Sequence, residues 1–545
     1  MRLSELLQTL LPDDGVDLKN QIPAKRQTLD HPQAPPPAVE RMPTLEITAV
    51  HYDSRLIKPG GLFVAIPGFT TDGHHYIQDA VDRGALAVVA QKPVVCDAVT
   101  LQVKNTRKAL AALAAEFYGH PSERLHIVGI TGTNGKTTTA YLIENMLAEA
   151  GIPVGVIGTV NYRYGGKVFS SPTTTPESLD LQRILAEMVQ DGITHVVLEV
   201  SSHAIDLFRV ESCDMDMGVF TNLTQDHLDF HGSMDRYWHS KKKLFTHYLR
   251  KSKKKRQPIA VINIDNDKGK ELVRDISYPC VTAGRWQESM VRPHDIRIDL
   301  KGIRGEIITP VGNFLFQSQL IGSYNLENIL CAAGTGVAFN LPLEVIKTGI
   351  EKTSAVPGRL EYVSSGSEKS VYVDFAHTPD ALRNVLQLLK GLGPQRMICV
   401  FGCGGDRDRV KRPLMGEIAG ELCDLVIVTS DNPRTEQPVE IIEQVLAGVK
   451  RTCPREYITQ DLQNGFSEKG HAAEPDRRHA IRLAIDAAKV GDIVLIAGKG
   501  HETYQTIGTR KIPFDDRLEA KKALAAAPFC NLENMDSPLF TQSRH

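Results

Sequence analysis

The sequence lacks any apolar stretch that approaches the roughly 20 residues of a membrane-spanning helix. Its amphipathic N-terminus has neither the apolar core nor the small-residue cleavage site of a signal peptide. The nine cysteines form no C-x-x-C pair and have no zinc-type spacing, so we expect free thiols in a reducing cytosol. A formal net charge of only −2 provides no basic field that would recruit nucleic acid. These absences favour a cytoplasmic protein with neither a membrane span nor a nucleic-acid partner. We also expect a monomer.

The chain is long: its 545 residues are enough for three or four domains. Strands and helices alternate along most of it, which predicts an α/β fold with largely parallel, helix-covered sheets. We expect three domains, over residues 1–120, 121–355 and 356–545. A stretch rich in Pro, Gln and Ala at about 23–43 is expected to be a flexible insert, and the polar tail from about 527 to be poorly ordered.

Short apolar runs predict where the strands lie. An Ala-rich helix is expected over residues 107–117, because a Gly-then-Pro stop signal follows it. The expected strands cover residues 61–66, 85–90, 127–130, 194–200, 258–263, 370–375, 397–401, 425–430 and 492–497.

The most informative motif runs from Ile127 to Thr139, where a strand-like run leads into a Gly-rich loop and then a helical pattern. Glycines in such a loop let backbone N–H groups close around phosphate oxygens, and the helix N-terminus adds its positive dipole end. Lys136 would reach the β- and γ-phosphates of a nucleoside triphosphate, and the Thr137 hydroxyl would ligate Mg²⁺. The pattern G-x-x-x-x-G-K-[ST] requires glycine where this chain has Ile130, so the match is near rather than strict. A Gly-rich βα turn without a ligand is the weaker alternative.

Two further strand ends carry residue types that bind metals. Glu199 closes one strand, and His227 follows another. Ligands of open α/β sheets lie beyond the carboxyl ends of strands, and a magnesium nucleotide needs hard oxygen ligands and charge neutralisation. We therefore expect a metal role for both residues, with an ordinary capped or surface residue as the alternative for each.

Six segments occur in an order that resembles the Mur ligases, the ATP-dependent amide-forming enzymes of peptidoglycan precursor synthesis. The resemblance extends from about Asp53 to Asp516, and the ordered series is specific although each motif alone is weak. It implies an N-terminal UDP-substrate domain, a P-loop-type central ATP-binding domain and a Rossmann-like C-terminal amino-acid-binding domain. The six segments are residues 131–139, 199–203, 226–229, 322–328, 357–359 and 374–379.

Lys241 lies where Mur ligases of this type carry a carbamylated lysine. Addition of CO₂ turns the amine into an anionic oxygen ligand, which suits a second magnesium ion. Carbamylation needs a neutral amine, so a pKa lowered by burial or by a nearby cation is implied. The adjacent Lys242 and Lys243 keep open a solvated basic run, which is also our interpretation of residues 251–256. The resemblance implies catalytic Lys136, Lys241, His227 and Glu199; metal ligands Thr137, Glu199, His227 and Lys241; and ATP contacts Gly132, Thr133, Asn134, Gly135, Lys136, Thr137, Thr138, Asn325, Arg359 and Asp374.

Within the family, the chain is similar to the members that add the third peptide residue to UDP-N-acetylmuramoyl-L-alanyl-D-glutamate. Residues 53–55 and 68–73 resemble their uridine-nucleotide pocket, and residues 173–176 resemble their muramoyl-peptide contact loop. Leu207 stands where related enzymes can carry a polar residue, which leaves one contact open. The implied contacts to the UDP-linked dipeptide are Ser54, Thr173, Thr174, Thr175, Ser201 and Arg209.

Residues 431–434 resemble the signature of family members that accept meso-diaminopimelate rather than lysine. Diaminopimelate carries a second carboxylate, which a guanidinium binds through two parallel hydrogen bonds, whereas a lysine side chain offers no such group. In isolation the segment could be an Asx-type turn after a strand. The implied amino-acid site consists of Arg407, Asp431, Asn432, Pro433, Arg434, Gly498 and Glu502, with Glu502 holding the distal ammonium.

The predicted reaction is the ATP-dependent ligation of meso-diaminopimelate to UDP-N-acetylmuramoyl-L-alanyl-D-glutamate through an acyl phosphate. Mg²⁺ and a CO₂-derived carbamate on Lys241 would assist it. Ligation of L-lysine, a sister activity such as folylpolyglutamate synthesis, and a nucleotide-dependent switch protein without ligase activity are the alternatives. The uridine-type N-terminal domain and Arg434 argue against the first two, and the amino-acid site argues against the third.

Overall fold

The computed structural model describes residues 1–10, 45–68, 71–299, 301–363 and 369–526. The expected insert, the tail from 527, and Phe69 and Thr70 of the predicted uridine pocket lie outside these residues. The chain divides into two compact units. One comprises Met1–Ile296, Arg304–Gln317 and Tyr324–Lys352, and the other comprises Arg297–Ile303, Ser318–Ser323 and Thr353–His545.

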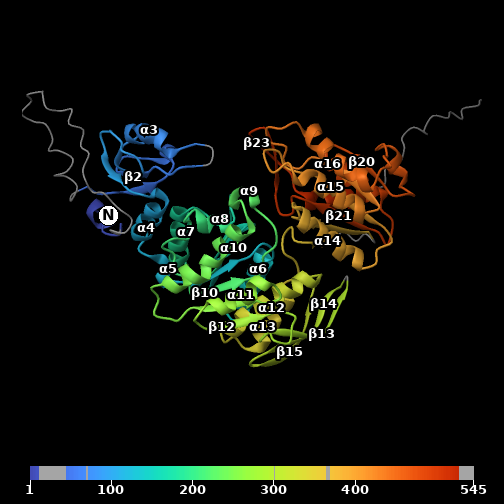
Figure 1. Ribbon diagram of the computed structural model, residues 1–545, viewed down its shortest axis with the longest axis horizontal. Coiled ribbons are helices and arrows are strands. Elements are labelled where there is room, and N and C mark those ends of the chain that lie inside the picture. Colours follow the sequence, from blue (N-terminus) through green and yellow to red (C-terminus); the bar gives the residue numbers. More distant parts are fainter. Residues whose placement is uncertain (11–44, 69–70, 300, 364–368, 527–545) are drawn as a thin grey trace, which may run out of the picture. The chain divides into compact units, whose positions relative to one another are not determined.

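The first unit begins with a four-stranded parallel sheet, drawn in blue around the label β2 in Figure 1. Its strand order is β1-β2-β3-β4. Leucines of two helices, α1 and α4, pack with these strands in one apolar core. The strand expected over 85–90 and the helix expected over 107–117 are confirmed, while the strand expected over 61–66 is two residues shorter. The bounds are α1 (Leu3–Leu7), β1 (Ala49–His51), β2 (Gly61–Val64), α3 (Ile77–Asp82), β3 (Ala85–Ala90), β4 (Val99–Gln102) and α4 (Thr106–Phe117).

An eight-stranded sheet follows, in the order β12-β11-β10-β5-β9-β6-β7-β8. Its strands are parallel from β12 to β6, and β7 and β8 are antiparallel. Apolar runs fit these parallel strands because helices cover both faces of such a sheet. The strands are β5 (His126–Thr131), β6 (Val154–Ile157), β7 (Asn161–Tyr164), β8 (Lys167–Ser170), β9 (His195–Glu199), β10 (Met217–Phe220), β11 (Ile259–Asn263) and β12 (Cys280–Ala283).

Two helices of this sheet, α6 and α10, carry the residues that follow the P-loop and the three lysines 241–243. The loop leads from β5 into α6, and Lys241 lies on α10. A third sheet, which is not among the elements expected from the sequence, consists of β13 (Arg292–Asp299), β14 (Gly302–Thr309) and β15 (Gly312–Ser318). The helices are α5 (Pro121–Arg124), α6 (Lys136–Glu149), α7 (Ser178–Gln190), α8 (Ser202–Asp206), α9 (Leu228–His231), α10 (Met234–Lys243), α11 (Asp267–Asp275), α12 (Ser323–Ala338) and α13 (Leu343–Lys352).

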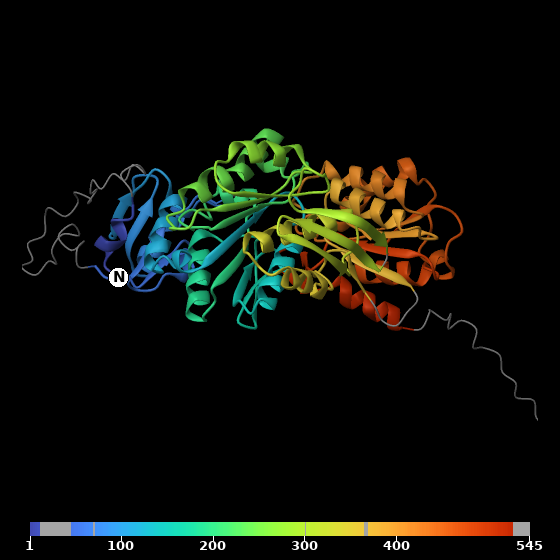
Figure 2. The same cartoon turned by 90° about the horizontal axis from the view of Figure 1, so that it is seen from below.

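The second unit contains a six-stranded sheet in the order β16-β17-β21-β18-β19-β20, in which only β16 is antiparallel. Helices α15 and α16 pack against each other beside it, in orange in Figure 2. All four expected strands are present. The bounds are β16 (Glu361–Tyr362), β17 (Ser370–Asp374), α14 (Pro379–Gly391), β18 (Met397–Phe401), α15 (Lys411–Leu422), β19 (Leu425–Val428), α16 (Pro438–Thr452), β20 (Gly470–Ala473), α17 (Arg477–Ala487), β21 (Ile493–Ala497), β22 (Tyr504–Ile507), β23 (Arg510–Pro513) and α18 (Asp516–Ala525).

In the basic run 251–256, Lys251, Lys253, Lys255 and Arg256 are exposed as expected, and the prediction is wrong at one lysine. Lys254, in the basic run expected to be solvated, keeps only 9% of its side chain exposed and forms a 2.5 Å ion pair with Asp216. Its amine also donates to the backbone carbonyl of Leu125, so the desolvated charge is compensated. The eight cysteines that the structure describes are free thiols. No helix among the described residues combines the length and apolar character needed to cross a membrane.

Candidate active site

The P-loop between β5 and α6 depends on two glycines with positive φ. Gly132 has φ +152° and Gly135, the N-cap of α6, has φ +86°. A Cβ atom on Gly132 would collide with the hydroxyl of Thr221, and one on Gly135 would collide with the side-chain oxygen of Asn328. Only glycine fits both positions. Lys136, Thr137 and Thr138 then open α6, where the helix N-terminus favours an anion.

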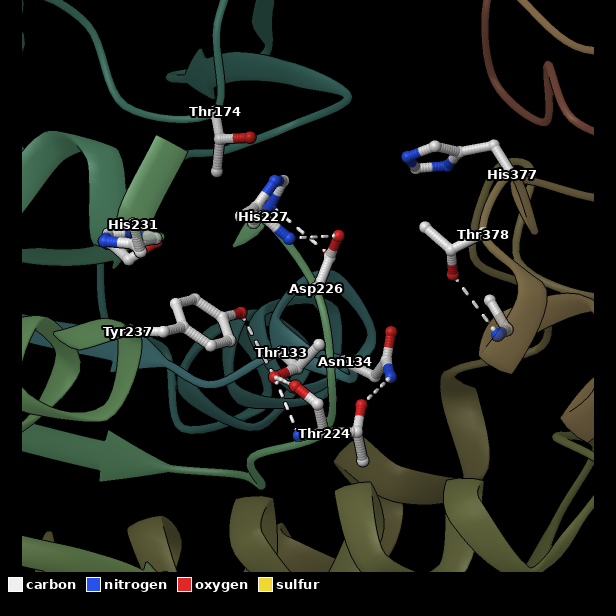
Figure 3. Close-up of polar contacts among 12 residues, drawn as sticks. Thr133, Asn134, Thr174, Thr224, Asp226, His227, His231, Tyr237, His377 and Thr378 are labelled. Carbon is white, nitrogen blue, oxygen red and sulfur yellow. Dashed lines mark hydrogen bonds and ion pairs between the residues drawn. The ribbon is translucent and has the colours of Figure 1, made fainter. Parts of the chain in front are cut away.

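The loop after β10 holds the front of the P-loop in place (Figure 3). The N–H of Thr133 donates to the Asn222 carbonyl at 3.0 Å, and the N–H of Asn134 donates to the Asn222 side chain at 2.9 Å. The hydroxyl of Thr133 donates to the Thr224 carbonyl and accepts from the Tyr237 hydroxyl, each at 3.1 Å. The backbone N–H groups of Thr133 and Asn134 are therefore used in hydrogen bonds within the fold. The positive groups that can face an anion are the N-terminus of α6 and the amine of Lys136.

Two lysine amines converge on one carbonyl of the loop. Lys136 and Lys241 each donate to the Gly132 oxygen at 2.8 Å. Only 1% of Lys241 is exposed, and its pKa lies well below the usual value because burial, and then the charge of Lys136, disfavour the ammonium. The solvated-run alternative is therefore wrong for Lys241. The solvated-run interpretation fits the neighbouring Lys242 and Lys243 better, because both form partly exposed ion pairs.

Glu199 and Thr137 meet beyond the ends of β9 and β5. The buried Glu199 carboxylate accepts hydrogen bonds from the Thr137 hydroxyl at 3.0 Å and from the Thr159 hydroxyl and N–H at 2.8 and 3.1 Å. A carboxylate beside a P-loop threonine hydroxyl is a donor set that fits Mg²⁺. Among the described residues, no group of three or more His, Cys, Asp or Glu side chains could hold a metal ion. Such a pair suits an ion that takes its other ligands from phosphate and water.

His227 is held by its own partners at the start of α9. It has φ +53° and keeps 42% of its side chain exposed, 3.3 Å from the Asp226 carboxylate. Its ring lies edge-on to that of His203, with centroids 4.8 Å apart, and Figure 3 shows it beside Asp226. The carboxylate of Glu199 contacts Thr137 and Thr159 instead. The structure therefore holds the predicted metal ligands His227 and Glu199 through different partners.

The residues predicted to contact the UDP-linked dipeptide fall into two places. Thr175 bonds the Glu199 carbonyl at 2.8 Å and the Ser201 N–H at 3.2 Å, and Arg209 donates to the Thr175 carbonyl at 3.0 Å. Thr173 and Thr174 belong to this same loop, through bonds to Thr175 and Thr159. Ser54 lies elsewhere, buried at the start of a short 3₁₀ helix that packs against α3, where it hydrogen-bonds Asp79.

The predicted ATP contacts outside the loop have local partners in each unit. In the first unit, the buried Asn325 accepts a 3.1 Å hydrogen bond from Asn328, the residue that faces Gly135. In the second unit, the buried Asp374 accepts from the N–H groups of Leu360 and Ala376, and burial raises its pKa. Arg359 lies over the Phe375 ring.

Two arginines come together on the second unit, where β18 and β19 end. Arg434 (φ +51°) and Arg407 flank Gly404. Burial, followed by the charge of Arg407, lowers the pKa of Arg434. Arg434 donates to the Gly405 carbonyl at 2.7 Å, which fixes its guanidinium, while Arg407 is exposed. The two positive charges act on each other, and an anion bound near them would relieve this repulsion.

A buried lysine orients the acidic side of the same region. Lys499, which is fully buried, donates to the Glu502 carboxylate at 2.8 Å, and Asn432 donates to the same oxygen at 2.8 Å. Asp431, Asn432 and Pro433 are buried. A Cβ on Gly498 would lie 2.7 Å from an oxygen of Asp431, which makes glycine necessary there. The structure thus brings all seven predicted amino-acid-site residues into one region of the second unit.

Sequence comparison identifies the family. Family models described as the Mur ligase middle domain, the Mur ligase glutamate ligase domain and the Mur ligase family catalytic domain match residues 130–336, 358–500 and 46–118. The chain belongs to the Mur ligase family.

Individual relatives cover almost the whole of this Mur ligase. A UDP-N-acetylmuramoyl-L-alanyl-D-glutamate–2,6-diaminopimelate ligase of Geobacter metallireducens is 51% identical over 481 residues, which are 88% of this chain and 94% of the relative. The protein of the same name from Geobacter sulfurreducens is 48% identical over 494 residues, or 90% and 97%. A solved structure of a ligase with this name has a TM-score of 0.60 and 30% identity, covering 91% and 97%.

Several contact residues of this Mur ligase were not predicted from its sequence. Asn328 lies inside the segment 322–328, and Lys499 lies between the predicted site residues Gly498 and Glu502, so position was their signal. Asn222 lies four residues before the segment 226–229. Thr159 had none, because it follows β6 and reaches Glu199 only through the adjacency of β6 and β9. Tyr237 reads in the sequence as an ordinary aromatic of a helical run.

Proposed function

We propose that this chain ligates meso-diaminopimelate to UDP-N-acetylmuramoyl-L-alanyl-D-glutamate with ATP, in peptidoglycan precursor synthesis. The observation that carries the choice of amino acid is the pair Arg407 and Arg434 beside Glu502. The two guanidinium groups suit a carboxylate, and the carboxylate of Glu502 suits an ammonium. One region of the second unit therefore offers complementary charges for an amino-acid end, which lysine as the incoming residue does not have at its side-chain terminus.

The reaction needs activation of a carboxylate, because oxide is a poor leaving group. Transfer of the γ-phosphoryl group of ATP to the D-glutamate side-chain carboxylate forms an acyl phosphate and ADP. The amine of diaminopimelate then attacks the acyl carbon, and phosphate leaves as the amide forms and a proton is lost. The residues of this chain contribute position and charge rather than a covalent nucleophile. The amine of Lys136 lies at the Gly132 carbonyl of the P-loop. From there it would neutralise negative charge on the phosphoryl group as this group moves from ADP to the carboxylate of D-glutamate.

Mg²⁺ belongs to this proposal, with Thr137 and Glu199 as the pair that would hold it beside the phosphates. When bound, it would shield phosphate charge during transfer. The third and fourth proposed ligands are His227 and a carbamate on Lys241. Burial and the low pKa of the Lys241 amine support the carbamate, since a neutral amine can add CO₂ and release one proton.

The finer parts of the assignment are proposals as well. The contacts of Ser54, Thr173, Thr174, Thr175, Ser201 and Arg209 would position the UDP-linked dipeptide, and Asn325, Arg359 and Asp374 would contact ATP. We retain residues 1–120, 121–355 and 356–545 as domains, a monomeric state and a cytoplasmic location.

Phosphate release tests the function directly. Purified protein is given ATP, Mg²⁺, UDP-N-acetylmuramoyl-L-alanyl-D-glutamate, and either meso-diaminopimelate or L-lysine. We expect release that requires both the UDP-linked dipeptide and diaminopimelate, with product confirmed by mass. Equal turnover with lysine would contradict the arginine assignment, and hydrolysis that needs no acceptor would contradict the ligase.

A further inference from the structure

A cavity of about 320 Å³ lies in the first unit, at the N-terminal edge of the eight-stranded sheet. Its lining includes the first residues of four neighbouring strands, namely Ile259 of β11, Met217 of β10, His126 of β5 and His195 of β9. The P-loop follows the opposite end of β5. Because β5 has six residues, five steps of about 3.3 Å separate its ends by roughly 17 Å. The cavity, which we call the basal cavity, is therefore separate from the candidate active site.

Three aromatic rings line the basal cavity. His126 is the register partner of His195, and their rings stack with centroids 5.1 Å apart and planes within 9°. The Phe339 ring lies 5.1 and 5.6 Å from these two imidazoles. Nδ1 of His126 is buried and makes no hydrogen bond within the described part of the chain, and the nearest carboxylate oxygen of Asp216 is 3.7 Å away. Such rings favour a flat apolar body over an aliphatic one.

The charge balance of the basal cavity is positive. The buried Asp216 is already neutralised, because it accepts from Lys254 at 2.5 Å and from the Ile127 N–H at 2.7 Å. Arg256 lines the cavity from an exposed position and has no ion-pair partner among the described residues. Burial lowers the pKa of His126; Asp216 opposes this shift, and Lys254 and Arg256 reinforce it. The imidazole therefore adds no charge at neutral pH.

This balance selects the ligand. One guanidinium without a partner binds a carboxylate through two parallel hydrogen bonds. A dianion such as a phosphate monoester carries one more negative charge than this guanidinium can neutralise, so the cavity disfavours it. The volume is at the lower end of the range for small-molecule pockets, so the body is about the size of a single ring.

We propose that the basal cavity binds a small aromatic monocarboxylate, with its ring against His126, His195 and Phe339 and its carboxylate on Arg256. The site does not depend on the ligase activity proposed above. It is formed by the starts of the strands, whereas the candidate active site lies beyond their ends.

Benzoate is the probe that we would use on the full chain. Its binding is followed by calorimetry and by the ring resonances of isotope-labelled histidine, which His195→Gln assigns in part. We expect saturable binding that shifts the His126 and His195 signals. Arg256→Gln should weaken it by roughly tenfold, the size of one charge-assisted contact. Lys255→Gln, an exposed neighbour outside the lining, is the matched control and should change the affinity by less than about twofold.

Further ligands separate the parts of the proposal. Benzamide, which lacks the charge, and cyclohexanecarboxylate, which lacks the aromatic ring, should both bind more weakly than benzoate. Saturating ADP should leave benzoate affinity unchanged. Absence of benzoate binding, equal weakening by both substitutions, equal affinity for either analogue, or displacement by ADP would each overturn the assignment.

Discussion

The amine of Lys241 donates to the carbonyl oxygen of Gly132 at 2.8 Å, so a buried lysine of α10 contacts the backbone of the P-loop. The ring of Tyr237 faces the same amine, 4.5 Å from its centroid, and the Tyr237 hydroxyl bonds Thr133. Burial of an amine without a carboxylate partner is costly unless the amine loses its proton. Helix α10 and the P-loop are thus joined through the amine of Lys241. The chemistry of this contact depends on whether that nitrogen is protonated, neutral or carbamylated.

We predict that activity depends on CO₂ through this nitrogen. Removal of dissolved CO₂ and bicarbonate should lower ligase activity, and bicarbonate should restore it, because only the carbamate offers anionic oxygens at Lys241. Lys241→Arg keeps a positive charge but cannot form the carbamate, so it should lose at least about a hundredfold in kcat. The measurement is phosphate release at controlled bicarbonate concentration. Lys242→Arg, in the adjacent ion pair with Glu271, is the control; an active Lys241→Arg variant would rule out the carbamate.

The position of Lys241 shows what a sequence can and cannot predict. Tyr237, Lys241 and Leu244 are three or four residues apart and are all buried, so the helical period does place this lysine on the apolar face of α10. Two adjacent lysines hid that pattern. The strands were predictable because buried parallel strands need continuous apolar runs. The bonds from Asn222 to the P-loop were not, since they depend on which strands become neighbours in the sheet.

Arg434→Ala should impair diaminopimelate use far more than ATP use. Removal of one charge-assisted contact predicts a KM for diaminopimelate that is about ten- to a hundredfold higher, with the KM for ATP within about threefold of the wild type. Arg434→Lys should recover little, because an ammonium does not form the two parallel bonds. Initial rates with each substrate varied in turn give both constants. Arg409→Ala, an exposed arginine paired with Glu436, is the control. A uniform loss for both substrates would indicate that Arg434 only supports the loop through Gly405.

Acid should destabilise the first unit through His195. Burial, and then the nearby His126, lower the pKa of His195 to about 4, while an unfolded histidine titrates near 6.5. Between these values the unfolded chain binds a proton that the native chain does not. This contribution to stability is therefore complete above about pH 6.5 and is lost as the pH falls toward 4. Asp216 opposes the shift, and Arg256 and Lys254 reinforce it.

The slope of Tm against pH tests this assignment. His195→Gln should make the slope between pH 6.5 and 4 shallower, whatever it does to Tm at neutral pH. His239→Gln replaces an exposed histidine of α10 and should leave the slope as it is in the wild type. Identical slopes in all three proteins would show that His195 is protonated as easily in the fold as outside it.

Gly135→Ala should separate the strain of a left-handed backbone from the shape of the P-loop. Any L-residue at this φ of +86° costs roughly 1–2 kcal/mol, and here the new Cβ also collides with the side-chain oxygen of Asn328. Gly119 has φ +70° with nothing within 4 Å of an added Cβ, so Gly119→Ala carries the strain alone. Both variants should lose similar stability from the backbone, but only Gly135→Ala should bind ADP more weakly, by more than about tenfold. Adding Asn328→Ala should restore part of that affinity because it removes the colliding atom. Equal ADP affinity in the two single variants, measured by calorimetry, would mean that the loop tolerates a Cβ at the entrance to α6.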